Sequence, residues 1–274
     1  MLSLQLAHRL ENRHVLLIGA GDVAVTRIPK LLPTGCKLTI ISPSLHDKIR
    51  ATFPSEWHDG IPLGGVITNE HWNSQIQQSY RVVNDTYRQE QLDLEPAWSL
   101  ILVCISDHDV SRQIYEDVVA KYGSAQMINV ADVPPLCNFY FGANATLAQG
   151  RLQILVSTNG LSPRFSALLR DDIEQRYDSQ AGQLDLAIDK LGQLRSRIRV
   201  IACNTNDVAF RMNWVKLVTD RFGLAYCHVM DVEKLSHLFT QMYNDATLQT
   251  VTPVAVTDSD LPSHDYMLQH YSQL

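Results

Sequence analysis

The stretch from residue 14 to residue 43 joins two apolar segments through a glycine-rich turn and a helix. His14 to Ile18 is apolar, the turn begins at Gly19, helical spacing follows from Val25 to Leu32, and Lys37 to Ile41 is apolar again. A strand, a tight turn, a helix and a second strand within about 30 residues form a βαβ unit, whose strands run parallel. Strand and helix patterns alternate in this way through residue 145. We therefore predict a doubly wound α/β domain there.

The turn reads Gly19-Ala20-Gly21-Asp22-Val23-Ala24, a G-x-G-x-x-A pattern. Its two glycines let the chain turn tightly and bring backbone close to a pyrophosphate, and the small sixth residue lets the helix pack on the strand. The N–H groups at the helix start then face the phosphates. Between a strand and a helix the pattern favours dinucleotide binding, and a tight turn without a ligand is the alternative.

The end of the second strand bears on which dinucleotide would bind. Domains of this kind often carry an acid about 20 residues after the glycine motif, where it bonds the ribose. Here Ser42 and Pro43 occupy that place, and no Arg lies within several residues of them to hold a 2′-phosphate. Because a serine hydroxyl can also bond a ribose, these residues favour NAD over NADP.

A second informative stretch runs from Met127 to Asn144 and reads MINVADVPPLCNFYFGAN. Asp132 stands where an apolar, β-prone run ends, just before Pro134-Pro135. Ligands of an open parallel sheet bind beyond the carboxyl ends of its strands, so an acid at such an end is positioned for chemistry. An Asp before prolines also commonly caps its own turn. Taken alone, this stretch favours the capping role and leaves the chemical role open.

After Asp132 the regular alternation of strand and helix patterns ends. Two strands are predicted at residues 138–143 and 151–157, and a turn follows at Asn159-Gly160. Ser162 is a good N-cap and Pro163 a good first helical residue, so a helix is predicted to begin there.

Long helices are predicted for the rest of the chain. The first has an apolar stripe from Phe165 to Leu194 with a weak point near Gly182, and such a stripe packs on the chain's own core or on a partner subunit. Further helices are predicted at 206–222 and after Asp231, and a loose tail is predicted from Thr247 onward.

Composition and charge exclude several classes of protein. The 274 residues include 23 basic and 29 acidic side chains, and no Lys/Arg block runs longer than two, so a general nucleic-acid surface is disfavoured. Five widely spaced cysteines without a C-x-x-C pair indicate neither a disulfide framework nor a zinc site. No apolar run approaches the ~20 residues that span a bilayer, and the first residues do not read as a signal sequence. We expect a reduced, cytoplasmic protein without a nucleic-acid or membrane partner.

Three segments, LLIGAGDVA, NVADVPPLCNFYFGA and STNGLSPRFSALLR, occur in an order and spacing that resemble the precorrin-2 dehydrogenase/sirohydrochlorin ferrochelatase family of sirohaem biosynthesis. With the start SLQLAHRL and the additional C-terminal helices, the chain most resembles the fungal bifunctional members, over residues 3 to about 245. The second and third segments are more specific than the glycine motif. The departures are mild: Ala20 replaces a frequent Gly, Ala24 occupies a Gly-or-Ala position, and Val133-Pro134-Pro135 replaces a more charged segment.

The resemblance implies a homodimer with three domains per chain. These are a Rossmann NAD-binding domain at 1–145, a central α+β dimerisation domain at 146–200 and a C-terminal helical domain at 201–274. It also implies two reactions at one site, namely NAD-dependent oxidation of precorrin-2 to sirohydrochlorin and insertion of ferrous iron, a substrate, to give sirohaem. The family's essential aspartate falls on Asp132. One carboxylate could act as general base in both reactions, because the oxidation releases a proton and metallation removes pyrrole N–H protons.

The resemblance assigns binding residues as well. The predicted NAD contacts are Gly19, Gly21, Asp22 and Val23 in the first turn, Ser42 and Pro43 after the second strand, and Cys104 and Ile105, which follow from general Rossmann geometry. The substrate carries many carboxylates, so Ser162, Arg164 and Arg170 are predicted to serve substrate binding or the dimer, with solvated or intersubunit ion pairs as the alternative. His228 and His237 have no metal-ligand spacing, so no metal-binding residue is predicted.

Two other functions compete with this hypothesis. A short-chain dehydrogenase needs a Tyr-x-x-x-Lys dyad, and no tyrosine here has a Lys four residues on. An NAD(H)-binding, redox-sensing dimer without catalysis would need a DNA- or partner-binding segment, and the sequence shows none. Oxidation followed by iron insertion is therefore the favoured hypothesis.

Overall fold

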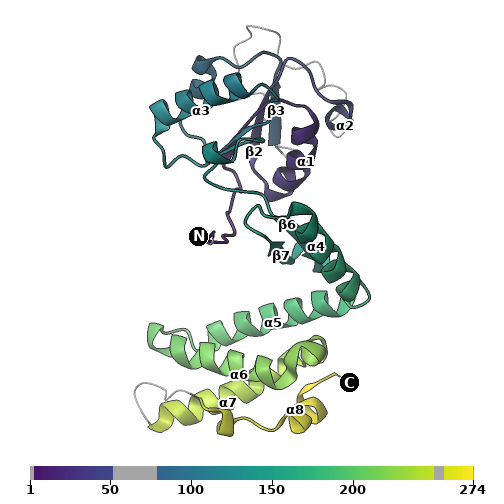
Figure 1. The fold of residues 1–274 in the computed structure, drawn as a ribbon. Coiled ribbons are helices and arrows are strands. Elements are labelled where there is room, and N and C mark those ends of the chain that lie inside the picture. Colours follow the sequence, from purple (N-terminus) through teal and green to yellow (C-terminus); the bar gives the residue numbers. More distant parts are fainter. Residues whose placement is uncertain (1–2, 52–78, 250–255, 274) are drawn as a thin grey trace. The chain divides into compact units, whose positions relative to one another are not determined.

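The computed structural model describes residues 3–51, 79–249 and 256–273. The chain forms two compact units, residues 4–141 and residues 142–274 with Ser3, which can be followed in Figure 1. The predicted boundaries after residues 145 and 200 fall within strand β6 (Ala143–Leu147) and at the last turn of helix α5 (Ala181–Ile201), and the three-domain division stays a prediction. The apolar pair Val66-Ile67 also predicts a short strand, and it lies outside the described residues.

The N-terminal unit contains a parallel sheet of five described strands in the order β3-β2-β1-β4-β5. The strands are β1 (His14–Ile18), β2 (Lys37–Ile41), β3 (Ser79–Val83), β4 (Leu100–Val103) and β5 (Ile128–Val130). The described helical connections are α1 (Asp22–Leu31), η1 (Leu32–Thr34), α2 (Asp47–Arg50), η4 (Gln89–Leu94), α3 (His108–Tyr122) and η5 (Pro134–Leu136). β1 lies between β2 and β4, so its end is central to the sheet.

Side chains of β1 enter two separate cores on the two faces of the sheet. Val15 and Leu17 belong to the core that includes α1, whereas Leu16 and Ile18 belong to the core that includes α3. Helices thus cover both faces, which explains why the strands are apolar along nearly their whole length. The predicted doubly wound α/β class is confirmed.

The strand predicted at residues 138–143 is wrong, because β6 begins only at Ala143. The preceding residues close the edge of β5 with side-chain and backbone hydrogen bonds and do not form a strand ladder. Asn138 Oδ1 accepts a hydrogen bond from Ile128 N at 2.9 Å, and Asn138 N donates to Ile128 O at 3.1 Å. The apolar, aromatic residues around Phe139 therefore resemble a strand in sequence without pairing as one.

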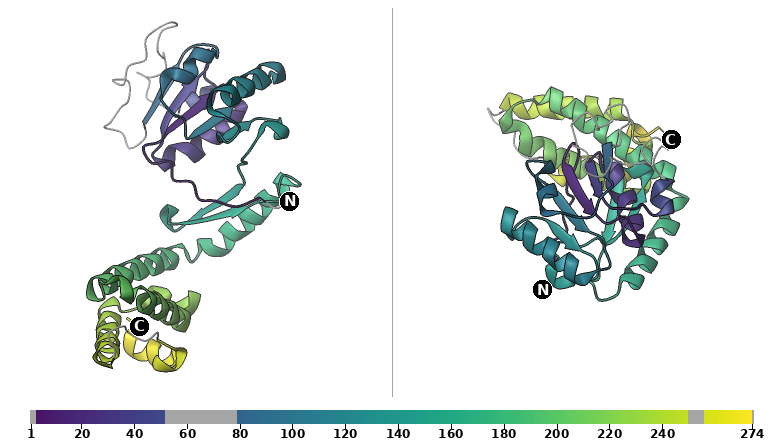
Figure 2. Two further views of the ribbon diagram at one scale, coloured as in Figure 1. Left: turned by 90° about the vertical axis from the view of Figure 1, so that its left-hand side faces the viewer. Right: turned by 90° about the horizontal axis from the view of Figure 1, so that it is seen from above.

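The second unit combines a hairpin with a bundle of helices, and Figure 2 shows these helices packed against one another. Its strands β6 and β7 (Leu152–Val156) are antiparallel and are joined through η6 (Ala148–Gly150). Its helical elements are α4 (Pro163–Asp178), α5, η7 (Thr205–Asp207), α6 (Val208–Tyr226), η8 (Cys227–Val229), α7 (Val232–Gln249), η9 (Asp258–Asp260) and α8 (His264–Tyr271). Trp214, Phe210 and Phe239 are fully buried and form edge-to-face pairs at its core.

The loose tail predicted from Thr247 onward is wrong for residues 256–273. Helix α7 continues to Gln249, and α8 packs into the same core through the buried Met267. Ser263 caps α8 by accepting a hydrogen bond from Tyr266 N. Helix α8 could not be predicted from this polar, proline-containing sequence, because it is only 8 residues long and has a single buried side chain.

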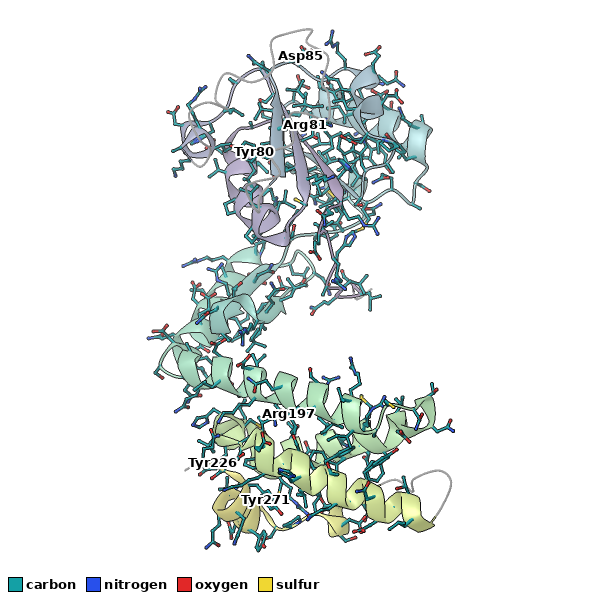
Figure 3. All side chains as sticks on the ribbon, turned by 180° about the vertical axis from the view of Figure 1, so that it is seen from behind. Tyr80, Arg81, Asp85, Arg197, Tyr226 and Tyr271 are labelled. Atoms are coloured by element: carbon teal, nitrogen blue, oxygen red, sulfur yellow. The ribbon has the colours of Figure 1, made fainter. Side chains whose placement is uncertain are left out.

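A buried polar network crosses the sheet of the N-terminal unit. Arg81 lies within β3 (Figure 3) and is 2% exposed. Its Nη2 donates a hydrogen bond to Glu95 Oε1 at 2.6 Å. Arg81 Nε donates to Thr39 Oγ1 at 2.9 Å on β2. His14 at the start of β1 reaches the other carboxylate oxygen, with Nδ1 3.3 Å from Glu95 Oε2. The network therefore links three adjacent strands to the segment that follows η4.

The pH dependence of stability is expected to depend on His14. Burial lowers its pKa below the ordinary value of 6.5, against the raising effect of Glu95. The unfolded chain therefore binds more protons than the folded one just below pH 6.5. The contribution of the neutral, buried His14 to the free energy of unfolding is thus complete above pH 6.5 and is lost as the pH falls. We expect His14→Asn to flatten the decline of the free energy of unfolding between about pH 7 and pH 5 in urea titrations. The exposed His108→Asn should leave this slope unchanged, and equal slopes for wild type and His14→Asn would contradict the expectation.

Candidate functional site

A cavity of about 390 Å³ lies at the carboxyl ends of four adjacent strands, β3, β2, β1 and β4. It is lined by Ile18, Gly19, Ala20, Gly21, Ile41, Ser42, Pro43, Ser44, Asp85, Thr86, Tyr87, Cys104, Ile105, Ser106, Asp107 and Val110. Six of the eight predicted NAD-binding residues are in this lining, and Asp22 and Val23 are not. The position matches the crevice where open α/β sheets bind ligands.

The two glycines of the first turn serve different purposes. Gly19 has φ +92°, and a Cβ there would lie 2.6 Å from Cys104 O and from Ile105 Cγ2, so only glycine lets β1 end against β4. At Gly21 a Cβ would meet no protein atom within 4 Å. Gly21 therefore keeps space open on the cavity side, where a ligand could approach the backbone.

This contrast predicts opposite outcomes for two alanine variants. Gly19→Ala should destabilise the protein by roughly 2–5 kcal/mol, because strained backbone and steric overlap add. Gly21→Ala should fold with nearly wild-type stability but bind NADH about tenfold more weakly or worse, because its methyl group occupies the open space. Urea denaturation and NADH fluorescence titration measure the two effects. A Gly21→Ala variant that binds NADH like the wild type would show that this space does not receive the coenzyme.

Two helix starts border the cavity, and they differ in capping. At α3, Asp107 accepts hydrogen bonds from Asp109 N and Val110 N, each at 3.0 Å. At α1 the N-cap is Gly21, which has no side chain to cap with. The first turn of α1 can therefore donate its N–H groups to an anion such as a pyrophosphate.

Asp22 and Val23 begin α1 just outside the cavity. The Asp22 side chain is 98% exposed, and its Oδ1 lies 3.3 Å from His46 Nε2. His46 N also donates to Ala20 O at 2.9 Å, so the segment after β2 is attached to the glycine turn. His46 Nδ1 accepts a hydrogen bond from Lys48 N, which leaves Nε2 as the nitrogen that faces Asp22.

Ser42 and Asp85 lie side by side at the ends of β2 and β3. Their backbone N–H groups converge on one acceptor, Val83 O, at 3.0 Å and 2.9 Å. Ser42 Oγ donates its proton to Ser44 O at 2.6 Å, so the hydroxyl faces any further partner as an acceptor. Asp85 was not predicted as a site residue; the available signal was an acid two residues beyond the strand that ends at Val83.

Cys104 and Ile105 line the wall of the cavity at the end of β4. Burial raises the pKa of Cys104 to about 12, so the thiol stays protonated and is no nucleophile at neutral pH. Ile105 is half-buried and contributes apolar surface. This pair can therefore offer shape and an apolar contact rather than reactive groups.

Asp132 follows β5, next to the strand whose end contributes Cys104, and it does not belong to the cavity lining. Its backbone has φ +57°, and its side chain is exposed. Ala131 N donates to Val103 O at 2.9 Å, which fixes the preceding residue to β4. Within the described residues no hydrogen bond reaches the Asp132 carboxylate, so the alternative role as a cap of its own turn gains no support.

The loop after Asp132 is fastened to β5 by Cys137 as well as Asn138. Cys137 Sγ accepts from Val130 N at 3.2 Å and donates to Val130 O at 3.1 Å. Asn129 Nδ2 donates to Phe139 O at 3.0 Å. The turn that carries Asp132 is therefore held at both ends, which sequence patterns did not indicate.

The predicted substrate residues belong to the other unit, at the N-cap and in the first half of α4. Ser162 is the N-cap, but its side chain makes no capping hydrogen bond; its N–H donates to Thr158 Oγ1 at 2.9 Å. Arg164 is exposed, and Arg170 Nε donates to the neighbouring Asp171 at 2.8 Å. The substrate role of these three residues stays a prediction.

The described parts of the chain contain neither a metal-ligand cluster nor a helix suited to crossing a membrane. Among those residues, no group of three or more His, Cys, Asp or Glu side chains is arranged to hold a metal ion. None of the described helices combines the length and the apolar character that a bilayer crossing requires.

Fold and site together define a Rossmann-type dinucleotide-binding protein. A family model described as putative NAD(P)-binding matches residues 6–143, and models for the central and C-terminal parts of sirohaem biosynthesis proteins match residues 149–176 and 182–249. The chain belongs to the family of sirohaem biosynthesis proteins.

Individual relatives agree with this membership. The siroheme biosynthesis protein of Saccharomyces cerevisiae is 45% identical over 253 residues, which cover 89% of this chain and 92% of that protein. The corresponding protein of Schizosaccharomyces pombe is 28% identical over 239 residues, covering 86% and 78%. A solved structure of SirC, a precorrin-2 dehydrogenase, matches with a TM-score of 0.57 at 19% identity, over 87% of this chain and 100% of that one. At this identity the match shows the shared fold.

Proposed function

We propose that this chain oxidises precorrin-2 to sirohydrochlorin with NAD and then inserts ferrous iron to give sirohaem, both at one site with Asp132 as general base. Support comes from the fungal relative at 45% identity and from the fold shared with a precorrin-2 dehydrogenase. The observation that carries the proposal is an exposed carboxylate beyond the end of β5, beside the β4 end that lines the cavity.

The cavity residues fit a dinucleotide. Gly21 leaves open space beside an uncapped helix start, which suits the pyrophosphate, and Ser42 offers an acceptor for a ribose hydroxyl. Cys104 and Ile105 provide an apolar wall. When bound, NAD would supply an acceptor for the hydride that leaves the macrocycle.

Asp132 is proposed to remove the protons that both reactions release. Oxidation of precorrin-2 transfers one hydride and releases one proton, so precorrin-2 and NAD⁺ yield sirohydrochlorin, NADH and H⁺. Metallation exchanges Fe²⁺ for two pyrrole N–H protons. A carboxylate exposed at a strand end can receive a proton in either case and return it to water.

Iron enters this scheme as a substrate. In this proposal the macrocycle nitrogens hold the metal, and no protein residue is assigned as its ligand. The task of the protein in this step is then to bind the macrocycle and to accept its N–H protons.

A homodimer formed through the central region is part of the proposal. Leu161, Phe165, Leu168 and Leu169 are 88%, 60%, 49% and 41% exposed, and they form an apolar surface at the start of α4. Such a surface is typical of a subunit contact. Ser162, Arg164 and Arg170 lie among these residues and would bind substrate carboxylates or contact the partner. The division at residues 1–145, 146–200 and 201–274 is proposed as the domain organisation.

We also propose that the protein acts in the cytoplasm. Its five cysteines are all free, and Cys36, Cys104 and Cys227 are buried as thiols. Free thiols are typical of proteins in a reducing compartment.

The experiment that tests the function supplies purified protein with precorrin-2 and NAD and follows the absorbance of sirohydrochlorin and NADH. Ferrous iron is then added, and the spectrum of sirohaem is recorded. Equal amounts of sirohydrochlorin and NADH, followed by metallation faster than in a protein-free control, are expected. NADH binding without turnover of precorrin-2 would instead support the redox-sensing dimer.

A further inference from the structure

Asp85 is a buried acid in the coenzyme cavity that the proposed mechanism does not use. It is 6% exposed, and Oδ1 accepts a hydrogen bond from Thr86 N at 2.8 Å. Oδ2 forms an ion pair with Arg88 and accepts a longer bond from Gln91 Nε2 at 3.4 Å. A carboxylate has about four acceptor sites, so Oδ1 retains capacity for one more donor.

The position of Asp85 relates it to the ribose side of the cavity. It follows β3, the neighbour of β2 (Figure 3). Its N–H shares the acceptor Val83 O with the N–H of Ser42. Dinucleotide-binding folds recognise the ribose 2′-hydroxyl at the end of the second strand, commonly through an acid there. Here the second strand ends in Ser42, and the acid comes from the third strand instead.

The charges around this position are unfavourable for a 2′-phosphate. Among the described residues, the cavity lining includes Asp85 and Asp107 but no Lys or Arg. Residues 52–78 add none, because that segment contains no Lys or Arg in its sequence. Ser42 Oγ has donated its proton to Ser44 O, so it presents lone pairs to the ligand. Arg88 is a cation on the β3 side of this position, and it forms an ion pair with Asp85.

We propose that Asp85 is the residue that selects NAD over NADP. With Ser42 it forms a set of acceptors that suits the hydroxyl donor of NAD and repels the dianion of NADP, and it also holds Arg88 away from a 2′-phosphate. The inference rests on the proposed use of a nicotinamide dinucleotide, and it adds the residue that discriminates between the two coenzymes.

The test compares the dissociation constants of NADH and NADPH by fluorescence titration of the full chain. Wild type should bind NADH more tightly than NADPH. Asp85→Asn keeps the acceptor for Thr86 N, removes the charge and releases Arg88, so the ratio of the NADPH to the NADH constant should fall by about tenfold. Arg88→Gln exposes the Asp85 charge and should raise this ratio. Asp93→Asn, an exposed acid in η4 outside the cavity lining, is the matched control and should leave it unchanged.

The outcomes separate this inference from the proposed function. A wild type that binds neither coenzyme would overturn both. A wild type that binds both equally, a folded Asp85→Asn with an unchanged ratio, or an equal shift in Asp93→Asn would overturn the selection by Asp85 alone. If circular dichroism shows that Asp85→Asn does not fold, the test uses Arg88→Gln instead. An unchanged ratio of the NADPH to the NADH dissociation constant in Arg88→Gln would then overturn the inference.

Discussion

Replacing Asp132 with Asn is expected to slow both the oxidation of precorrin-2 and the insertion of iron by roughly 100- to 10,000-fold, which is the usual contribution of a positioned general base. Binding of NADH should stay as in the wild type, because Asp132 is outside the cavity lining. Stopped-flow absorbance measures the two reactions, and fluorescence titration measures the binding.

Asn is the sharper substitution because the backbone of Asp132 has φ +57°. Asn tolerates this left-handed region nearly as well as Asp, whereas Ala adds strain. Asp132→Asn therefore removes the base while the turn stays in place. Asp132→Ala should lose both reactions as well, with a small additional loss of stability.

The control for this experiment is Glu116→Gln, which removes an exposed acid from the middle of α3. It should leave both rates unchanged. Normal turnover of Asp132→Asn would show that another group accepts the protons. Loss of one reaction alone would show that the two reactions do not share their base.

The second large effect is expected at the buried ion pair of the sheet. Glu95→Ala removes the carboxylate that pairs with the guanidinium of Arg81, which is 2% exposed, and should lower the free energy of unfolding of the N-terminal unit by about 3–5 kcal/mol. Urea denaturation followed by hydrogen exchange of peptides that cover β1 to β3 measures this unit separately from the helical one.

Two further variants test whether the buried ion pair itself causes the loss of stability in Glu95→Ala. Asp93→Ala removes the partner of Lys121 in an ion pair whose acid is 75% exposed, and it should cost less than about 1 kcal/mol. The double variant Arg81→Met/Glu95→Leu removes both charges and should recover most of the stability, because apolar groups replace the pair. A double variant as unstable as Glu95→Ala would show that altered packing, and not the loss of the Arg81–Glu95 ion pair, lowers the stability.

Local patterns in the sequence predicted the N-terminal fold well. The βαβ unit and its glycine turn could be predicted because strand, turn and helix signals are contiguous, and six of the predicted coenzyme residues do line the cavity. Asp85 was missed because it meets Ser42 only through the pairing of β2 with β3, across 42 intervening residues.

The errors also have physical causes. The residues around Phe139 have the apolar character of a strand, but Asn138 and Cys137 pair with β5 in a way that no periodicity encodes. Helix α8 is short and polar, and it depends on packing against the helical core, where Met267 is buried and Leu268 and Tyr271 are partly buried. The role of Arg164 and Arg170 depends on contacts beyond one chain's local pattern, so it stays a prediction.

The hydrogen bonds that hold the Asp132 loop to β5 also affect the tendency of this protein to aggregate at high concentration. Ile128 and Val130 direct their N–H and C=O groups away from β4, and Asn138 and Cys137 take up all four of these groups. An exposed strand edge with free amides is a template for another chain and a common start of aggregation. At β5 that template is blocked by the side chains of Asn138 and Cys137 and by the backbone N–H of Asn138, so this edge of the sheet offers no free amide to a second sheet.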